Sequence, residues 1–150
     1  MKLYLIISVL TLALSLGAGA YLTDFPAYLG DDPATCNRCH VMDAAYEGWY
    51  HGGHRPWATC NDCHTPHSPV LKYLYKGYVG TRDVILYTFD WYPLAARAEP
   101  LSQTIIQENC LRCHGETVSA VGDGQPDAGR NCVSCHRSVA HGVRGISLAP

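Results

Sequence analysis

The stretch Cys36-Asn37-Arg38-Cys39-His40-Val41-Met42 contains the pattern that decides this fold, Cys-x-x-Cys-His. In this pattern two thiols attach a haem covalently through its vinyl groups, and the adjacent histidine reaches the iron. The pattern occurs four times in 150 residues, and it uses all eight cysteines: Cys36, Cys39 and His40; Cys60, Cys63 and His64; Cys110, Cys113 and His114; Cys132, Cys135 and His136. Zinc sites and disulfide frameworks need no histidine after every second cysteine, so the sequence predicts four covalently bound haem c groups.

The segment before the first motif predicts a membrane anchor. Residues 3–22 contain no charged side chain, and twenty such positions are enough for a helix to cross the hydrocarbon layer. Lys2 lies on the side that the positive-inside rule assigns to the cytoplasm, so the haem motifs are expected in the periplasm. Ala18-Gly19-Ala20 resembles a signal-peptide cleavage site, but the apolar run is longer than a usual signal core. We therefore expect a retained single-pass anchor over residues 1–23 in the cytoplasmic membrane.

The remaining residues, 24–150, are expected to form one small tetrahaem cytochrome c domain. A chain this short cannot surround four haems and also build a separate protein core, so the haems themselves are expected to form the core. The predicted fold class is therefore mainly α with much loop, with an N-terminal transmembrane helix and a small multihaem domain. The net charge of −2 gives no indication of a nucleic-acid partner.

Three local patterns give further expectations. An asparagine adjoins the first cysteine of every motif, which suggests duplication of a two-haem unit. Residues 70–94 are rich in aromatic and branched side chains, so they predict either a buried helix or a segment at the membrane surface, although Gly77 and Gly80 weaken a helix. A helix over residues 102–109, with Ser102 as its N-cap, is expected to lead into the third motif.

The supply of iron ligands leaves two hypotheses open. Four irons need eight axial ligands, and the chain has eight histidines, which allows bis-histidine ligation at every haem, as in a plain electron carrier. Met42 offers an alternative, because a thioether also binds haem iron and this one lies two residues after His40. Met42 would either replace His40 as a ligand or only pack against the porphyrin.

Taken together, these motifs resemble the NapC/NirT family of membrane-anchored tetrahaem quinol dehydrogenases. The shared features are a single N-terminal membrane helix, CxxCHxM at the first motif, GH before the second, CNDCHxPH at the second, KxxxGxRD after it and CHRxxxH at the fourth. The length and the short tail are most similar to the NrfH branch, the small subunits of cytochrome c nitrite reductases. The resemblance covers nearly the whole chain.

The resemblance implies different ligands at the two ends of the haem series. Met42 would bind haem 1 in place of His40, which leaves the opposite face of the iron open toward quinol. Haem 4 would keep His136, and a lysine of the partner subunit would supply its second ligand. His51 and His67 then have no ligand role, and a hydrogen bond is the expected role of His67.

The two middle haems would be bis-histidine sites. The resemblance implies that His141, which follows the fourth motif, pairs with His64 on haem 2. His54, which precedes the second motif, would pair with His114 on haem 3.

The stretch KxxxGxRD supplies Lys76 and Asp83, which the resemblance places against the open face of haem 1. A quinol loses two protons as it gives up two electrons, so a base has to accept a proton as the first electron leaves. Asp83 is predicted to be this base, with a pKa raised by partial burial, and Lys76 is predicted to hydrogen-bond a quinol oxygen. The residues alone also allow a simpler interpretation, a surface lysine–aspartate pair or an ion pair between Asp83 and Arg82.

The function implied by the resemblance is oxidation of menaquinol and transfer of the electrons to a periplasmic multihaem reductase. The expected partner is the catalytic subunit of an ammonia-forming nitrite reductase, and this chain is not expected to reduce nitrite itself. The alternatives are an electron donor to nitrate reductase within the same family, a plain bis-histidine carrier without a quinol site, and a redox or gas sensor that signals through the membrane helix.

Overall fold

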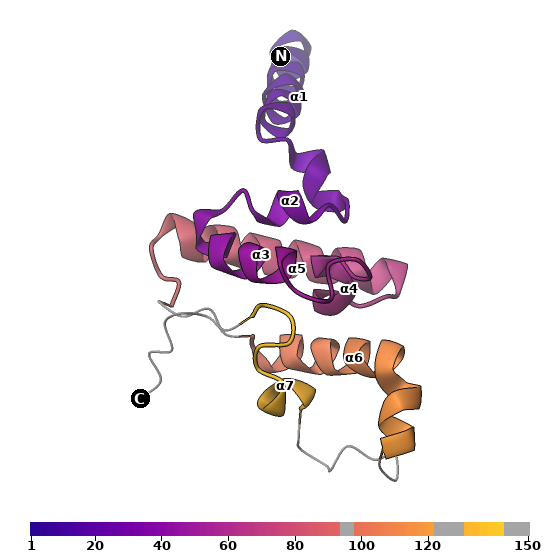
Figure 1. Cartoon of the computed structure of the whole chain (residues 1–150). Coiled ribbons are helices and arrows are strands. Elements are labelled where there is room, and N and C mark those ends of the chain that lie inside the picture. The colour runs from indigo at the N-terminus through magenta and orange to yellow at the C-terminus, as the bar shows by residue number, and fades with distance from the viewer. Residues whose placement is uncertain (94–97, 122–130, 143–150) are drawn as a thin grey trace.

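The computed structural model describes residues 1–93, 98–121 and 131–142, and every regular element within these ranges is helical (Figure 1). The elements are α1 (Lys2–Leu22), η1 (Phe25–Leu29), α2 (Pro33–Cys36), η2 (His40–Met42), α3 (Asp43–Tyr50), α4 (Cys60–His64), α5 (Pro69–Thr88), α6 (Pro100–Val121) and α7 (Cys132–Cys135), where η marks a 3-10 helix. The predicted fold class, mainly α with much loop, is confirmed.

Helix α1 projects away from the other elements as one continuous helix of 21 residues (Figure 1). None of its residues is buried, and it is long and apolar enough to cross a membrane. At about 1.5 Å per residue it spans roughly 30 Å, which is the thickness of a bilayer's hydrocarbon core. The Thr23 hydroxyl donates to Gly19 O at 2.8 Å, and the left-handed Asp24 (φ 49°) turns the chain into η1.

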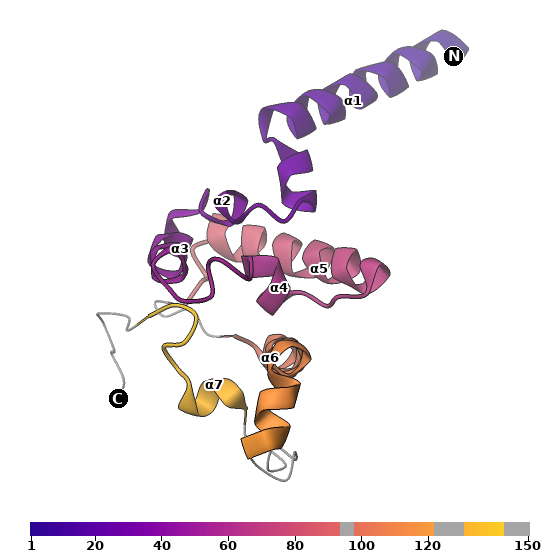
Figure 2. The same ribbon diagram turned by 45° about the vertical axis from the view of Figure 1, so that its right-hand side comes forward.

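The four haem motifs follow one another through the domain in chain order. The first motif spans the end of α2 and the start of η2, the second forms α4, the third lies inside α6 and the fourth forms α7. Helix α2 packs against α4, α4 against α6, and α6 against α7. Figure 2 shows this succession from α2 down to α7. The attachment points are therefore arranged as a series rather than as two separate clusters.

The asparagines beside the motifs link each motif to the segment that carries the previous one. Three of the four asparagine side chains donate hydrogen bonds across elements in this way. The bonds are Asn61 Nδ2 to Gly30 O (3.1 Å), Asn109 Nδ2 to Cys63 O (3.0 Å) and Thr65 O (2.9 Å), and Asn131 Nδ2 to Gln103 Oε1 (3.2 Å). The repeated asparagine that suggested duplication thus also holds the series of motifs together.

Protein atoms alone build almost no core. Among the described residues Ile105 is the one buried apolar side chain, and the buried polar residues are Thr35, Thr65 and Asn109. A domain of ordinary composition would bury many apolar side chains in mutual contact. This lack of a side-chain core agrees with the prediction that covalently attached haems fill the interior.

Two local expectations are corrected by the structure. Helix α5 contains no buried residue, so the buried-helix prediction for residues 70–94 is wrong; the last residue of that range lies outside the described ranges. The helix runs through Gly77 and Gly80 without a break. Helix α6 begins before Ser102, so Ser102 is not its N-cap; its hydroxyl instead hydrogen-bonds the Tyr75 hydroxyl at 2.7 Å.

Replacing Asn109 by alanine is expected to lower the free energy of unfolding by about 1–3 kcal/mol. Asn109 is buried, so two carbonyl oxygens would lose their donor at a place that water does not readily reach. Asn61→Ala is the matched control, because it also removes two hydrogen bonds but from a solvent-exposed side chain. Thermal unfolding followed by circular dichroism at equal haem content measures both variants. Equal losses of unfolding free energy in the two variants would show that burial of the Asn109 amide adds nothing to the cost of removing its hydrogen bonds.

Candidate haem-binding and quinol sites

The eight cysteines are free thiols, as covalent haem attachment requires. The thiol of Cys36 lies beside that of Cys60, and the thiol of Cys110 lies beside that of Cys132, as the effect of the neighbouring thiol on the pKa of Cys36, Cys60 and Cys110 indicates. The first motif therefore meets the second, and the third meets the fourth, at their attachment points. Each motif also places its histidine directly after the second thiol. The donor set matches the chemistry of haem c at all four positions.

His64 and His141 face each other across the space beside α4. Their ring centroids are 6.0 Å apart, with an angle of 36° between the rings. An imidazole nitrogen binds a metal at about 2.0–2.1 Å, so two rings on opposite sides of one iron have centroids roughly 6 Å apart. His141 Nδ1 donates to Ala45 O at 2.8 Å, and such a bond leaves Nε2 as the nitrogen that can bind a metal.

His54 and His114 form a second pair of the same kind. Their ring centroids are 6.2 Å apart and the rings are nearly perpendicular, at 81°. His54 Nδ1 lies 3.2 Å from Val139 O and donates to it, which again leaves Nε2 available. The structure thus brings together both histidine pairs implied by the family resemblance. In each pair the second histidine comes from a segment far away in the sequence.

Gly48 of α3 is a residue that sequence reasoning missed. A Cβ atom built on Gly48 would lie 1.9 Å from the carbonyl oxygen of His141 and 3.0 Å from its Cα atom. Only a residue without a side chain allows α3 to approach the His141 backbone this closely. The Ala45 carbonyl that accepts from His141 belongs to the same helix, so α3 positions this histidine in two ways. A single glycine in a short helix carries no sequence signal for such a contact.

The first motif is arranged differently from the second and third. Its histidine, His40, is 91% exposed and points toward Asp43, with Nδ1 3.5 Å from Oδ2. Met42 lies at the other end of the 3-10 turn η2 and is 37% exposed. Residues two apart in a 3-10 helix point in different directions, because each residue turns by about a third of a circle. The side chains of His40 and Met42 therefore point in different directions, and they would approach a haem iron from different directions.

The two remaining histidines have other partners. His67 Nε2 donates to Asp62 O at 3.2 Å, which is the hydrogen-bonding role expected for it. His51 Nε2 lies 3.3 Å from a carboxylate oxygen of Glu47. In the part of the chain that the structure describes, neither ring pairs with the histidine of the first or the fourth motif. An all-histidine ligand set would need such pairs at both ends of the series.

Lys76 and Asp83 both lie on α5, but each has its own partner. Lys76 Nζ donates to Gly30 O at 2.6 Å, in the loop between η1 and α2. Asp83 Oδ1 lies 3.2 Å from Arg82 Nη1, so the ion pair considered as the simpler interpretation is present. The Arg82 guanidinium also forms an ion pair with Glu99, just before α6. The aspartate thus shares its cation with a second carboxylate.

Both candidate quinol-site groups have perturbed acidities. Desolvation raises the pKa of Asp83, and the neighbouring Arg82 guanidinium lowers it by a smaller amount. Desolvation lowers the pKa of Lys76, against an opposing effect from Asp31. Asp83 remains 59% exposed, so solvent screens its interaction with Arg82. A carboxylate with a raised pKa is a better proton acceptor, which is the property that quinol oxidation needs.

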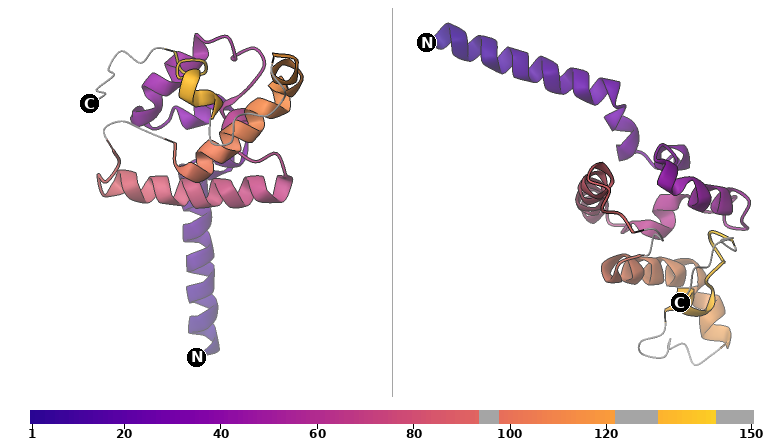
Figure 3. Two further views of the ribbon diagram at one scale, coloured as in Figure 1. Left: turned by 90° about the horizontal axis from the view of Figure 1, so that it is seen from below. Right: turned by 90° about the vertical axis from the view of Figure 1, so that its left-hand side faces the viewer.

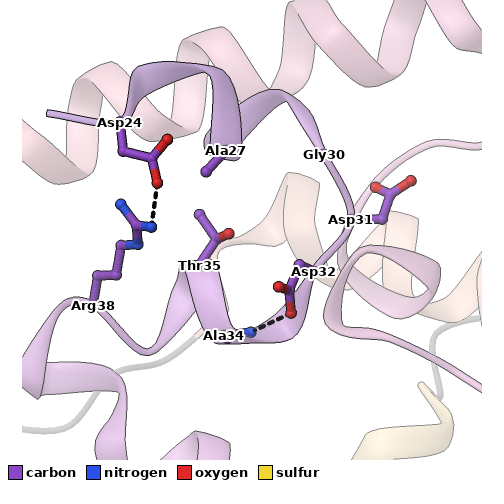
Figure 4. Close-up of a pocket in the computed structure, with 8 residues that line it drawn as sticks. All are labelled: Asp24, Ala27, Gly30, Asp31, Asp32, Ala34, Thr35 and Arg38. Atoms are coloured by element: carbon purple, nitrogen blue, oxygen red, sulfur yellow. Dashed lines mark hydrogen bonds and ion pairs between the residues drawn. The ribbon is translucent and has the colours of Figure 1, made fainter. Parts of the chain in front are cut away.

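Next to Gly30, an open pocket of about 370 Å³ lies between η1 and α2 (Figure 4). Its lining is mostly polar. Figure 4 shows Asp24 facing Arg38 and Asp32 facing the Ala34 amide, and Asp31 forms an ion pair with Lys72 of α5. Arg38, inside the first motif, forms an ion pair with Asp24 directly after α1, and Asp32 caps α2 by accepting from Ala34 N at 2.9 Å. This region therefore connects the apolar helix to the first haem motif.

Comparisons with known proteins show the family to which this sequence is similar. Residues 2–145 match the NapC/NirT cytochrome c family, N-terminal region. The chain is 32% identical to the cytochrome c-type protein NrfH of Wolinella succinogenes, over 95% of this chain and 89% of that protein. It is also 32% identical to the cytochrome c nitrite reductase subunit NrfH of Nitratidesulfovibrio vulgaris, over 74% of this chain and 68% of that protein.

A solved structure is similar to this chain as well. The crystal structure of the cytochrome c nitrite reductase NrfHA complex, bound to the HQNO inhibitor, contains a chain that is 28% identical to this one. The two chains align with a TM-score of 0.66, over 97% of this chain and 93% of the other. The likeness therefore extends over nearly the whole of both chains and includes the elements that carry the four motifs.

Proposed function

This chain belongs to the NapC/NirT cytochrome c family, and we propose that it oxidises menaquinol in the membrane and passes the electrons to a nitrite reductase. One observation supports this function over a plain electron carrier: His64 and His114 each face a second histidine, whereas in the described structure His40 and His136 face none. A series of haems that takes electrons from quinol at one end and meets a partner at the other requires end haems that differ from the two middle haems.

The proposal assigns a place to each part of the chain. Residues 1–23 form the anchor, and residues 24–150 form a tetrahaem domain on the periplasmic side. The bound haem c groups, when present, accept the electrons one at a time. Met42 would hold the first haem. The pairs His64 with His141 and His54 with His114 would hold the two middle haems.

The last haem would be held by His136 and by a lysine of the partner subunit. The positions of the chain's own lysines support this arrangement, since each of them lies away from the fourth motif. Lys72 Nζ binds Asp31 at 2.7 Å, Lys76 donates to a backbone carbonyl beside it, and Lys2 lies at the start of α1. The relatives named as nitrite reductase subunits point to the catalytic subunit of that enzyme as the partner.

At the quinol site the protein would handle the protons. Asp83 would accept a proton from a quinol hydroxyl, since its raised pKa favours proton uptake. The Lys76 ammonium would donate a hydrogen bond to the quinol oxygen and stabilise the negative charge that develops there. Lys76 reaches the loop just before α2, so the site would lie beside the first haem motif.

The test is reduction of the full-length, haem-loaded protein in detergent by a menaquinol analogue, compared with reduction by dithionite. Rapid haem reduction by both is expected. HQNO, which binds the related complex, should block only the quinol-driven reaction. Haems that dithionite reduces and quinol does not would overturn the quinol site. Identification of the reductase that co-purifies would separate a nitrite reductase partner from a nitrate reductase partner.

The rate of quinol-driven reduction is expected to fall as the pH falls through the pKa of Asp83. A protonated carboxyl cannot accept a proton, and the raised pKa places this decline at a higher pH than for an ordinary aspartate. Arg82→Gln removes the cation that lowers this pKa, so the decline should move to still higher pH. Arg82→Lys retains the charge and is the matched control. A decline that stays in place, or moves to lower pH, in Arg82→Gln would contradict the role of Asp83.

A further inference from the structure

Helix α5 has its charged side chains on the side that faces the domain. The four charged residues of α5 are Lys72, Lys76, Arg82 and Asp83, and at 3.6 residues per turn they share one side of the helix. Their contacts show where this side points. Lys72 and Lys76 reach the loop before α2, Arg82 reaches Glu99, and the Tyr75 hydroxyl on the same side meets Ser102.

The opposite side of α5 is apolar and open. Leu71, Leu74, Tyr78, Thr81 and Ile85 follow one another at spacings of three and four residues, which places them on one stripe. We call these five residues the outer stripe. Its large side chains are between 45% and 65% exposed, and it contains no charged residue. A surface helix in water has the reverse pattern, with its charged side outward and its apolar side against the protein.

The position of α5 relative to α1 indicates what covers the outer stripe. Figure 3 shows α5 lying across the foot of α1, on the side of the domain toward which α1 extends. An open groove of about 590 Å³ lies beside part of the stripe. Its lining residues are Tyr78, Thr81 and Ile85 of the stripe, together with Gly77, Arg82, Leu86 and Trp91. Trp91 and Tyr92, directly after the helix, are 67% and 39% exposed.

We propose that the outer stripe of α5, together with Trp91 and Tyr92, lies in the interfacial zone of the bilayer that α1 crosses. Tryptophan and tyrosine concentrate at the membrane–water boundary, and interfacial helices bury an apolar side there while lying parallel to the surface. A bilayer fits this surface better than a protein partner does, because α5 lies where α1 leaves the membrane. The charged side of α5 stays in the domain. On the proposed function, this placement would keep the quinol site within one helix of the lipid.

Labelling by a photoactivated lipid tests this placement without any turnover, so its result is independent of the proposed quinol chemistry. The full-length, haem-loaded protein is placed in phosphatidylethanolamine and phosphatidylglycerol vesicles that contain a diazirine-tailed phosphatidylcholine. Mass spectrometry then locates the lipid adducts. Adducts are expected on α1 and on the outer stripe, several-fold above those on Leu101. Leu101 of α6 is 55% exposed, the same fraction as Leu71, and serves as the internal control.

Two variants make the test specific. Leu74→Glu and Ile85→Glu place a charge in the outer stripe, so they should reduce the adducts on α5 several-fold and leave those on α1 unchanged. Leu101→Glu, the matched control, should change neither, and haem content should be equal in all variants. Adducts confined to α1 would overturn the proposal. So would crosslinks between copies through α5, or loss of the α5 adducts once a co-purified reductase is bound, because either result would mean that protein covers the stripe.

Discussion

Replacing Gly48 by alanine is expected to displace His141 and to remove the second axial ligand from the haem attached at the second motif. The new Cβ atom would lie 1.9 Å from the His141 carbonyl oxygen, far inside the contact distance of about 3.5 Å at which carbon and oxygen atoms pack. Backbone atoms cannot rotate away as a side-chain end does. The segment that carries His141 would have to move, and its hydrogen bond to Ala45 O would be lost.

Spectroscopy distinguishes this effect from general loss of the fold. One low-spin haem should become high-spin in electron paramagnetic resonance and magnetic circular dichroism, while four haems remain covalently attached. The matched control is Gly115→Ala in α6, since a Cβ atom at Gly115 would meet nothing within 4 Å apart from its chain neighbours and the backbone of its own helix, and alanine favours a helix. His141→Ala should reproduce the Gly48→Ala spectrum. An unchanged set of low-spin signals in Gly48→Ala would show that His141 does not bind this haem.

Asp83→Asn is expected to slow quinol-driven haem reduction by about 10²- to 10⁴-fold, the usual contribution of a positioned general base. Asparagine has nearly the same shape and its side-chain oxygen still accepts from Arg82, but it cannot take up a proton. Dithionite should reduce the variant's haems as fast as those of the wild type, because it needs no proton acceptor. The decline of the rate at acid pH should also disappear.

Asp90→Asn is a matched control for this variant. Asp90 lies just after α5 and has a left-handed backbone (φ 56°), a conformation that asparagine also adopts readily. The same chemical change outside the candidate site should leave the quinol-driven rate within about threefold of the wild type. If Asp83→Asn also stayed within that range, another group would have to accept the quinol's proton and the assignment of Asp83 would be wrong.

The sequence alone was sufficient wherever the chemistry uses neighbouring residues. Haem attachment needs two thiols and a histidine within five consecutive positions, so four motifs could be counted directly. A membrane-crossing helix needs one uninterrupted apolar run, and residues 3–22 form it. The lack of a side-chain core followed from the length of the chain compared with the size of four haems. The ligand pairs came from the family resemblance, since spacing alone left the all-histidine set open.

The tertiary structure decided the relations between distant segments. His64 meets His141 across 77 positions of sequence, and Gly48 approaches the backbone of the same histidine across 93 positions. No local sequence pattern indicates such contacts. Ser102 was expected to be a helix cap because the pattern did not show that a tyrosine of α5 would reach it. Residues 70–94 fit a buried helix as well as a surface one, because composition does not say which side of a helix finds partners. Long-range packing turned the charged side of α5 inward, and this left the apolar side exposed.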